Sequence, residues 1–400
     1  MRVAMLGTRG VPARYGGFET CVEEVGRRLV RMGHEVTVYC RDGGTERTTE
    51  YLGMRLVRLP ALRRKSLETL SHTALSVGDA VRDRPDVALV FNAANSPFLP
   101  LLRARGIPVA THVDGLEWKR AKWGKSGARY YRVAESLAVR WSDALISDSR
   151  GIQNYYAERF GVKSDYIPYG APVLDTVGAD GLAKYGLRAG EYHLVVARFE
   201  PENHIDLAVA GYLRSGARHP LVVVGTAPYS GAYTTRVRKL AESGSGVRLV
   251  GAVWDQRALN QLYANALTYV HGHSVGGTNP SLLRAMGAAT SVSAFDVGFN
   301  REVLGPHGAY FTDAETLAEC FDRAEERPQD TLDRGRAQVA ELTEHYDWDD
   351  VARGYAELVE RLSSSGTSSG GGSTSRALGF SNRGAAGVRR WIRSKGVRRR

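Results

Sequence analysis

The 400-residue sequence is poor in cysteine and has no long apolar segment. Its three cysteines, Cys21, Cys40 and Cys320, are an odd number without Cys-x-x-Cys spacing, which excludes a disulfide scaffold and a zinc knuckle. No run of about 18 or more apolar residues occurs, which argues against a transmembrane helix. The first residues also lack the apolar core and cleavage site of a signal peptide. We therefore expect a soluble protein of the cytoplasm.

Acidic residues are absent from residues 363–400, which contain nine of the 54 lysines and arginines. The net charge of +11 for the whole chain therefore leaves only +2 for residues 1–362. Because a nucleic-acid-binding protein normally carries its positive charge on a folded face, we expect no nucleic-acid partner. The tail combines its cations with Trp391 and Ile392 behind a Ser/Gly-rich linker, which suits an anionic membrane surface. A solvated extension explains the same composition equally well.

Short β-branched segments alternate with amphipathic helical segments in two successive series. This alternation predicts two parallel sheets, each covered by helices on both faces. We expect α/β domains over residues 1–170 and 171–347, a helix over 348–362, and a linker with a basic tail over 363–400. The expected strands are Val3–Leu6, Glu35–Cys40, Met54–Leu59, Val87–Phe91, Pro108–His112, Ala144–Ser147, Ser164–Ile167, Tyr192–Ala197, Leu221–Gly225, Val247–Val250, Thr268–His271 and Ser291–Phe295.

Open parallel sheets bind ligands at the carboxyl ends of their strands, so the loops that follow strands are where a site is expected. The loop over residues 7–17 joins the first strand to a long helix. Its glycines allow close approach of the backbone to a ligand, and the helix N-terminus offers N–H groups to an anion. Arg9 and Arg14 add positive charge. An anionic ligand is the favoured interpretation, and an ordinary long turn is the alternative.

The segment THVDGLEWKRAKW, residues 111–123, gathers two carboxylates, an imidazole, two indoles and several cations after an expected strand. Carboxylates or histidine can orient an acceptor hydroxyl. Indole faces suit sugar rings or the membrane interface, and cations suit a diphosphate. The alternative is a solvated loop whose tryptophans pack on the adjoining helix, but the density of reactive residue types favours a functional site.

The segment ARFEPENH, residues 197–204, follows the first strand of the second series. Arg198 is placed there to bind phosphate oxygens in a bidentate manner. We expect a site role for Arg198 and Asn203. For Glu202 we expect a structural role, complementing the first turn of the next helix.

The segment HGHSVGGTNPSLL, residues 271–283, runs from a strand through a Gly-Gly loop into a helix that Pro280 can begin. The backbone N–H groups near the helix N-terminus would then point at an anion, which suits the diphosphate of a nucleotide sugar. His271 and His273 have no third ligand spaced to complete a metal site, so we expect no metal.

Seven stretches of the sequence together carry a resemblance to a known family: GTRGVPARYGGFET, HVDGLEWKRAKW, SDSRGIQNYY, YIPYGAP, ARFEPENHID, HGHSVGGTNPSLL and FDVGFNREVLG. They cover about residues 1–362 in order. The chain resembles retaining glycosyltransferases of family 4 and, more narrowly, the bacterial rhamnosyltransferase-type subfamily of surface-polysaccharide synthesis. The resemblance implies the GT-B fold, in which two Rossmann-like, doubly wound parallel-sheet domains face each other across a cleft. It implies acceptor binding in the first domain, nucleotide-sugar binding in the second, and a final helix that crosses back.

The resemblance also implies roles for single residues. The expected catalytic residues are His112, Asp114, Glu117 and Arg198, of which Arg198 would stabilise the departing diphosphate. The expected substrate-binding residues are Arg9, Gly16, Gly17, Asn203, His273, Gly277, Thr278, Asn279 and Arg284. Such enzymes generally need no metal or cofactor, because side-chain cations and helix dipoles neutralise the leaving group.

Two positions depart from the broader family. Its usual Glu-x7-Glu pair, whose second member binds the nucleotide ribose, is replaced by Gly276 and Arg284. A thymidine-diphosphate donor that needs the Glu less, a second phosphate contact made by Arg284, and an inactive protein are three interpretations that stay open. The Lys that often follows the phosphate Arg by five residues is Asn203 here, as in the narrower subfamily.

The resemblance leads us to expect a transferase that moves a hexose, with L-rhamnose from dTDP-β-L-rhamnose as the favoured donor. The expected acceptor is lipid-linked or a polysaccharide, the configuration is retained, and the work takes place in the cytoplasm or peripherally at the inner face of the cell membrane. The alternatives are a transferase that uses a UDP- or GDP-sugar and a non-catalytic carbohydrate-binding relative.

Overall fold

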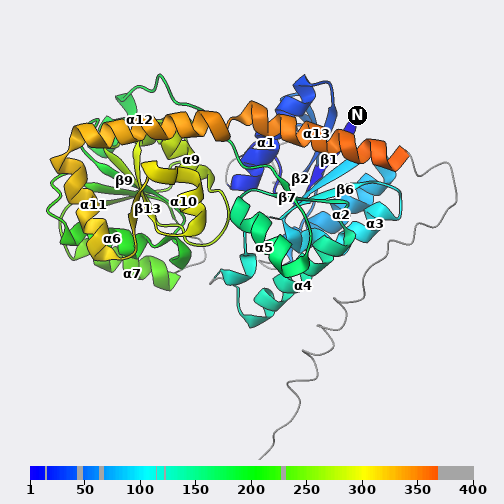
Figure 1. The fold of residues 1–400 in the computed structure, drawn as a ribbon, viewed down its shortest axis with the longest axis horizontal. Coiled ribbons are helices and arrows are strands. Elements are labelled where there is room, and N and C mark those ends of the chain that lie inside the picture. The colour runs from blue at the N-terminus through cyan, green and yellow to red at the C-terminus, as the bar shows by residue number, and fades with distance from the viewer. Residues whose placement is uncertain are drawn as a thin grey trace, which may run out of the picture.

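The computed structural model describes residues 1–13, 16–42, 48–62, 67–113, 115–120, 123–226 and 231–367. Two lobes lie side by side (Figure 1). The N-terminal lobe is built on an eight-stranded sheet and the C-terminal lobe on a six-stranded sheet. The prediction of two parallel, Rossmann-like α/β sheets is therefore confirmed.

The sheet of the N-terminal lobe has the strand order β3-β4-β2-β1-β5-β6-β7-β8. Every neighbouring pair is parallel except β3 and β4. Its strands are β1 (Arg2–Leu6), β2 (Glu35–Arg41), β3 (Glu50–Tyr51), β4 (Met54–Leu59), β5 (Val87–Phe91), β6 (Val109–His112), β7 (Ala144–Ser147) and β8 (Asp165–Tyr166). Its helices are α1 (Gly17–Arg31), α2 (Glu68–Asp83), α3 (Leu99–Arg103), α4 (Lys125–Trp141) and α5 (Arg150–Phe160).

The sheet of the C-terminal lobe has the order β11-β10-β9-β12-β13-β14, and all of its pairs are parallel. Its strands are β9 (His193–Val196), β10 (Leu221–Val224), β11 (Val247–Gly251), β12 (Thr268–His271), β13 (Ser291–Phe295) and β14 (Ala309–Phe311). Its helices are α6 (Ile205–Arg214), α7 (Gly231–Glu242), α8 (Gln256–Ala264), α9 (Pro280–Gly287), α10 (Gly298–Leu304), α11 (Ala314–Glu326) and α12 (Pro328–His345).

Continuous apolar strands form the centre of each lobe. All five residues of β5 and all four residues of β10 are buried, as expected for parallel strands that are covered on both faces. Helix α1 presents a single apolar stripe to the sheet, on which Val22, Val25 and Leu29 are fully buried. These cores fix the strand ends, and therefore the loops that follow them.

The last described helix, α13 (Trp348–Thr367), runs along the N-terminal lobe after α12 has covered the C-terminal lobe (Figure 1). It packs on α1, where Arg28 donates a hydrogen bond to Asp349 at 2.5 Å and Tyr355 contacts the Cys21 sulfur at 3.7 Å. The helix extends past Leu362, the expected end, and Ser364 and Ser365 donate to the Arg361 carbonyl within its last turn. The rest of the expected linker and tail lies outside the described residues.

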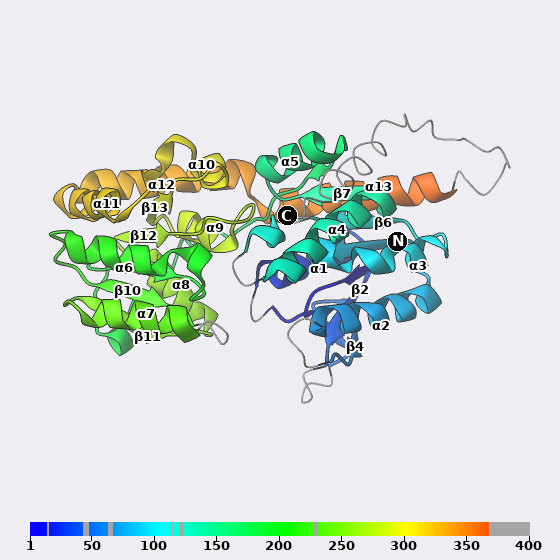
Figure 2. The same ribbon diagram turned by 90° about the horizontal axis from the view of Figure 1, so that it is seen from below.

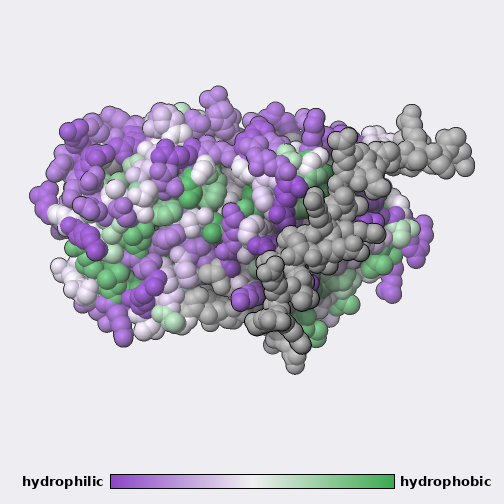
Figure 3. Space-filling view, turned by 60° about the horizontal axis from the view of Figure 1, so that its bottom comes forward, coloured by the Kyte–Doolittle hydropathy of each residue, from purple (hydrophilic) through white to green (hydrophobic). Residues whose placement is uncertain are grey.

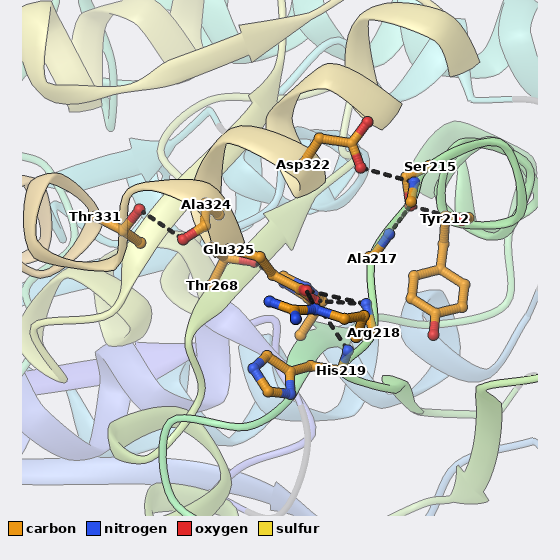
Figure 4. Close-up of polar contacts among 12 residues, drawn as sticks. Tyr212, Ser215, Ala217, Arg218, His219, Thr268, Asp322, Ala324, Glu325 and Thr331 are labelled. Carbon is orange, nitrogen blue, oxygen red and sulfur yellow. Dashed lines mark hydrogen bonds and ion pairs between the residues drawn. The ribbon is translucent and has the colours of Figure 1, made fainter.

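A buried carboxylate anchors the N-terminal edge of β9 (Figure 4). Glu325, at the end of α11, accepts hydrogen bonds from the backbone N–H groups of Arg218 and His219, both at 2.9 Å, and contacts His193 Nε2 at 3.2 Å. Burial opposes the negative charge, but the hydrogen bonds from His193 and the two amides outweigh it and lower the pKa of Glu325 to about 2. The other ring nitrogen of His193 contacts the Thr268 hydroxyl at 2.7 Å, which ties β9 to β12.

Hydrophilic side chains cover most of the described surface on the face drawn in Figure 3, and the hydrophobic patches between them are small. Within the described ranges, every helix is too short or too polar to cross a membrane.

Candidate functional site

The loops at the carboxyl ends of the two sheets meet where the lobes face each other. Figure 2 shows α9 on the side of the C-terminal lobe that faces the N-terminal lobe. Contact is close at two pairs: a Cβ atom on Gly17 would lie 3.1 Å from Pro280 Cγ, and one on Gly115 would lie 3.1 Å from Gly276 Cα. The interface therefore brings together the N-terminus of α1, the loop after β6, the loop after β9 and the loop after β12.

His112 is the last residue of β6 and is 1% exposed. Its ring stacks with those of Phe91 and Tyr169, each at 5.7 Å between centroids, and meets Phe18 edge-on at 5.3 Å. Burial lowers the pKa of His112 to about 3, so the imidazole is neutral at physiological pH. Its Nδ1 atom makes no hydrogen bond with any described residue, so it can hydrogen-bond a ligand hydroxyl.

Glu117 begins a short 3-10 helix, Glu117–Lys119, and is buried. Its carboxylate pairs with Arg120 Nε at 2.5 Å and accepts a hydrogen bond from the Trp123 indole at 3.1 Å. The second catalytic carboxylate expected in this loop, Asp114, lies outside the described residues.

Arg198 and Asn203 belong to the same turn after β9. The Asn203 amide donates to the Arg198 carbonyl at 2.8 Å, and its Oδ1 atom lies 2.7 Å from His273 Nδ1. Burial and the positive charges of Arg120 and Arg198 keep the pKa of His273 well below its usual value, so this ring is neutral. The Arg198 side chain is half-buried, and its guanidinium makes no hydrogen bond or ion pair with any described residue. Asn203 therefore positions its neighbours, while Arg198 keeps its donors available.

The Gly-Gly loop and the start of α9 lie against the N-terminal lobe. A Cβ atom on Gly277 would lie 2.1 Å from Asp148 Oδ1, and the Thr278 hydroxyl donates to the Asp148 carbonyl at 2.6 Å. Asn279 caps α9 by accepting hydrogen bonds from the Ser281 N–H and hydroxyl. A larger residue at position 277 would meet the Asp148 side chain, so the glycine lets the loop backbone come this close to the other lobe.

The N-terminus of α1 contributes Gly16 and Gly17. Gly16 has a positive φ of 111°, which favours glycine, and it precedes the helix without a side-chain cap. Glu19, in the first turn, instead accepts a hydrogen bond from the Arg9 backbone N–H at 3.1 Å, and the Arg9 side chain is exposed. The N-termini of α1 and α9 therefore lie on opposite sides of one interface, and both favour negative charge.

Arg284 lies on α9, the helix that begins at the Gly-Gly loop. Its guanidinium donates to Gln256 Oε1 at 2.9 Å, on the side of α9 that faces α8. The side chain therefore bridges two helices of the C-terminal lobe.

Three further charged residues at the interface were not among the expected site residues: Arg120, Glu202 and Glu302. Arg120 approaches the C-terminal lobe, with its Nη1 atom 4.0 Å from Glu202 Oε1. Glu302 on α10 accepts hydrogen bonds from the backbone N–H groups of Arg150 and Gly151 at 2.6 and 3.2 Å, so it caps α5 from the other lobe. The cations in the segment around Arg120 do indicate a site. The two contacts across the lobes could not be predicted, because each joins residues that are far apart in the sequence.

The described residues contain no group of three or more His, Cys, Asp or Glu side chains that could hold a metal ion. They do include an open depression of about 640 Å³ between α6 and α7, which is lined by His204, Asp206, Arg236 and Lys239 among others. Arg236 there pairs with Asp206, so Lys239 is the cation that makes the depression a rival to the interface as an anion site.

Comparisons with known proteins agree with this architecture. The sequence model of the glycosyl transferase 4-like domain matches residues 16–170, and that of the glycosyl transferases group 1 matches residues 191–326. No sequence among the curated proteins matches the chain.

Several solved structures share the fold. Sucrose-phosphate synthase from Thermosynechococcus elongatus superposes with a TM-score of 0.79 at 20% identity, over 91% of this chain and 99% of that one. Anabaena HepE in complex with UDP-glucose gives 0.75 at 17% identity, over 90% and 100%. A glycosyltransferase from Rickettsia africae gives 0.69 at 14% identity, over 90% and 98%. At these identities the likeness concerns the fold, whereas the two family matches concern the sequence. The chain is therefore a glycosyltransferase of family 4 with the GT-B fold, a class of enzymes that takes its sugar from a nucleotide-sugar donor.

Proposed function

We propose that this glycosyltransferase moves L-rhamnose from dTDP-β-L-rhamnose, with retention, to a lipid-linked or polysaccharide acceptor in the synthesis of a surface polysaccharide. The support for the sugar is the resemblance of seven stretches of the sequence to the rhamnosyltransferase-type subfamily. The support for the location of the reaction is the interface at which the carboxyl ends of the two sheets meet.

One observation carries the proposal: the available guanidinium of Arg198 lies at an interface that is flanked by the N-termini of α1 and α9. A departing nucleoside diphosphate carries negative charge that grows as the glycosidic bond breaks. A guanidinium with free donors and two helix N-termini stabilise such a group without a metal ion. The backbone N–H groups of Gly277 and Thr278 are proposed to complete the phosphate contacts.

The other proposed site residues would position the sugars. His112 is neutral at physiological pH, so it would bind a sugar hydroxyl through a hydrogen bond and contribute no positive charge. Glu117, held by Arg120 and Trp123, would line the acceptor side. The division of labour that we propose follows the expected domains, with the acceptor on residues 1–170 and the donor on residues 171–347.

A UDP-sugar donor is the second candidate. It is favoured by the fold shared with Anabaena HepE, whose structure was solved with UDP-glucose. Arg284, which stands where the family usually has a ribose-binding Glu, donates one hydrogen bond to Gln256 and retains further N–H donors for a second phosphate contact.

The decisive experiment incubates the full-length protein with UDP-, GDP- and dTDP-linked hexoses and a prenyl-diphosphate-linked sugar acceptor, and reads the products by mass. A product only with dTDP-rhamnose supports the proposal, and a product with a UDP- or GDP-hexose selects the alternative. Absence of any transfer, together with binding of the acceptor, would indicate a non-catalytic carbohydrate-binding relative.

We also propose that the basic tail brings the enzyme to the inner face of the cell membrane. Each cation near an anionic surface contributes roughly 1 kcal/mol to binding. Co-sedimentation with liposomes that contain anionic lipid, with and without residues 376–400, tests this. Equal binding of the two proteins would remove the tail from the proposal.

A further inference from the structure

Two carboxylates at the interface lack the hydrogen bonds that buried carboxylates normally receive. Glu200 and Glu202 flank Pro201 in the turn that also contains Arg198. Glu202 is 6% exposed, and neither of its carboxylate oxygens receives a hydrogen bond from an N–H or hydroxyl group of any other described residue, while its own backbone N–H and the Glu200 carboxyl group lie close to it. Oε2 of Glu200, whose side chain is half-buried, likewise receives no such hydrogen bond from the described residues.

A buried carboxylate without hydrogen-bond donors is unfavourable in the protein without a ligand. Burial and the neighbouring charge of Glu200 raise the pKa of Glu202 above its usual value. The nearest cation, Arg120 of the N-terminal lobe, is 4.0 Å away, beyond hydrogen-bonding distance, and already pairs with Glu117. Buried polar groups without partners are rare in folded proteins, and each calls for a physical explanation. At an interface of strand-end loops, a ligand that completes the hydrogen bonds is such an explanation.

The charges around the pair restrict the chemistry of that ligand. A phosphate would be repelled by two adjacent carboxylates. A cation would be repelled by Arg120 and Arg198, and the described residues contain no metal-binding cluster. What remains is a neutral molecule with several hydroxyl donors, which is the chemistry of a sugar ring.

The position of the pair indicates which sugar this is. Glu202 is joined to the Gly-Gly loop, because its backbone carbonyl accepts the Ser274 N–H at 2.9 Å. The next residue, Asn203, holds both the Arg198 carbonyl and His273. The carboxylates thus belong to the C-terminal lobe and to the same turn as Arg198, the proposed contact of the diphosphate. This position favours a sugar attached to that diphosphate over a separate acceptor.

We propose that Glu202, assisted by Glu200, accepts hydrogen bonds from hydroxyl groups of the transferred sugar and so helps to select it. The inference rests on the proposed function, because it requires a nucleotide sugar with its diphosphate at Arg198. It assigns to Glu202 a direct contact with substrate in place of the helix-capping role expected from the sequence.

Calorimetry with matched pairs of probes separates the sugar from the nucleotide. The wild-type protein and the Glu202→Gln and Glu200→Gln variants are titrated with UDP, UDP-glucose, UDP-galactose, GDP, GDP-mannose, dTDP and dTDP-β-L-rhamnose. For the sugar that the wild type prefers, Glu202→Gln should weaken binding of the nucleotide sugar about 10-fold or more, because hydrogen bonds to charged groups are among the stronger ones. Binding of the matching nucleoside diphosphate should change less than twofold. Glu200→Gln should show the same split to a smaller extent, and Glu242→Gln, at an exposed end of α7, should change neither affinity.

The possible failures are distinguishable. If the wild type binds none of these nucleotides, the proposed function fails and the inference with it. If the nucleotides bind but the attached sugar never alters the affinity, or if Glu202→Gln weakens the nucleotide and the nucleotide sugar equally, the inference is wrong while the proposed function stands. Circular dichroism and thermal unfolding of each variant confirm that a loss of binding is not a loss of fold.

Discussion

The two ends of strand β9 each carry a buried glutamate, and the two glutamates are in opposite situations. At the N-terminal edge, the Glu325 side chain is 6% exposed and is held by His193 and two backbone amides, which lower its pKa to about 2. Past the carboxyl edge, the Glu202 side chain is 4% exposed and receives no hydrogen bond from an N–H or hydroxyl group of any other described residue, and burial raises its pKa. Residue type and side-chain exposure are nearly equal, so the difference comes from the surrounding groups: amide and imidazole donors at Glu325, and the Glu200 carboxylate beside Glu202.

This difference separates a structural carboxylate from one that is left for a ligand. Figure 4 shows the Glu325 carboxylate filling its hydrogen-bonding capacity with groups from the loop after α6, which fixes that edge of the sheet. The carboxyl edge of a parallel sheet is where ligands bind, and open hydrogen-bonding capacity is what a binding site requires. The predictions below test this contrast from the largest expected effect to the smallest.

The largest effect is expected from Arg198, the cation at the carboxyl edge. Arg198→Ala should lower kcat about 100-fold or more, because charge in the transition state loses its contact. Steady-state kinetics with the donor identified by the nucleotide-sugar panel measures this. Arg214→Ala, an exposed arginine on α6, is the matched control and should leave kcat unchanged. Near-normal turnover of the Arg198 variant would contradict the site.

At the opposite end of β9, Glu325→Gln should lower the free energy of unfolding by about 2 kcal/mol, because buried amide donors lose a charged acceptor. A depressed carboxyl pKa contributes stability above the ordinary pKa of the group, so the deficit should be full at pH 7 and should shrink as the pH falls from about 4.5 toward about 2. Urea unfolding at several pH values measures it. The exposed neighbour variant Glu326→Gln should show no deficit. A loss of kcat in the folded Glu325→Gln variant would contradict a purely structural role for Glu325.

A smaller effect is expected from Glu302, which caps α5 across the lobes. Glu302→Ala should lower the free energy of unfolding by about 1 kcal/mol, the usual worth of a helix cap. Thermal unfolding measures the loss, with Glu242→Ala as the exposed control. An unchanged melting temperature would show that the contact between the lobes contributes nothing to stability.

The smallest effect on stability is expected from Glu202→Gln. A carboxyl group with a raised pKa destabilises the folded state above the ordinary pKa, so the neutral amide should leave stability unchanged or raise it by up to about 1 kcal/mol at pH 7. The gain should fade toward pH 4, where the wild-type group is itself protonated. Urea unfolding at both pH values tests this, and a loss as large as that of Glu325→Gln would refute the contrast between the two ends of β9.

The sequence predicts the fold well, because strands such as Val87–Phe91 are continuous apolar runs between turn residues. It also predicts which loops would meet, since the carboxyl ends of parallel strands share an edge. It does not predict β14, whose three residues, Ala309–Phe311, become a strand only by pairing with β13. Nor does it predict that Glu202 is buried opposite Arg120, because that depends on how two lobes come together. The hydrogen bond between Arg284 and Gln256 is hidden for the same reason.

The most direct test of the central claim is a crystal structure of the protein with UDP or dTDP bound. The account predicts that the paired phosphates contact the Arg198 guanidinium and the backbone N–H groups of the loop that leads into α9. Phosphates bound instead in the depression between α6 and α7, on Arg236 and Lys239, would contradict it.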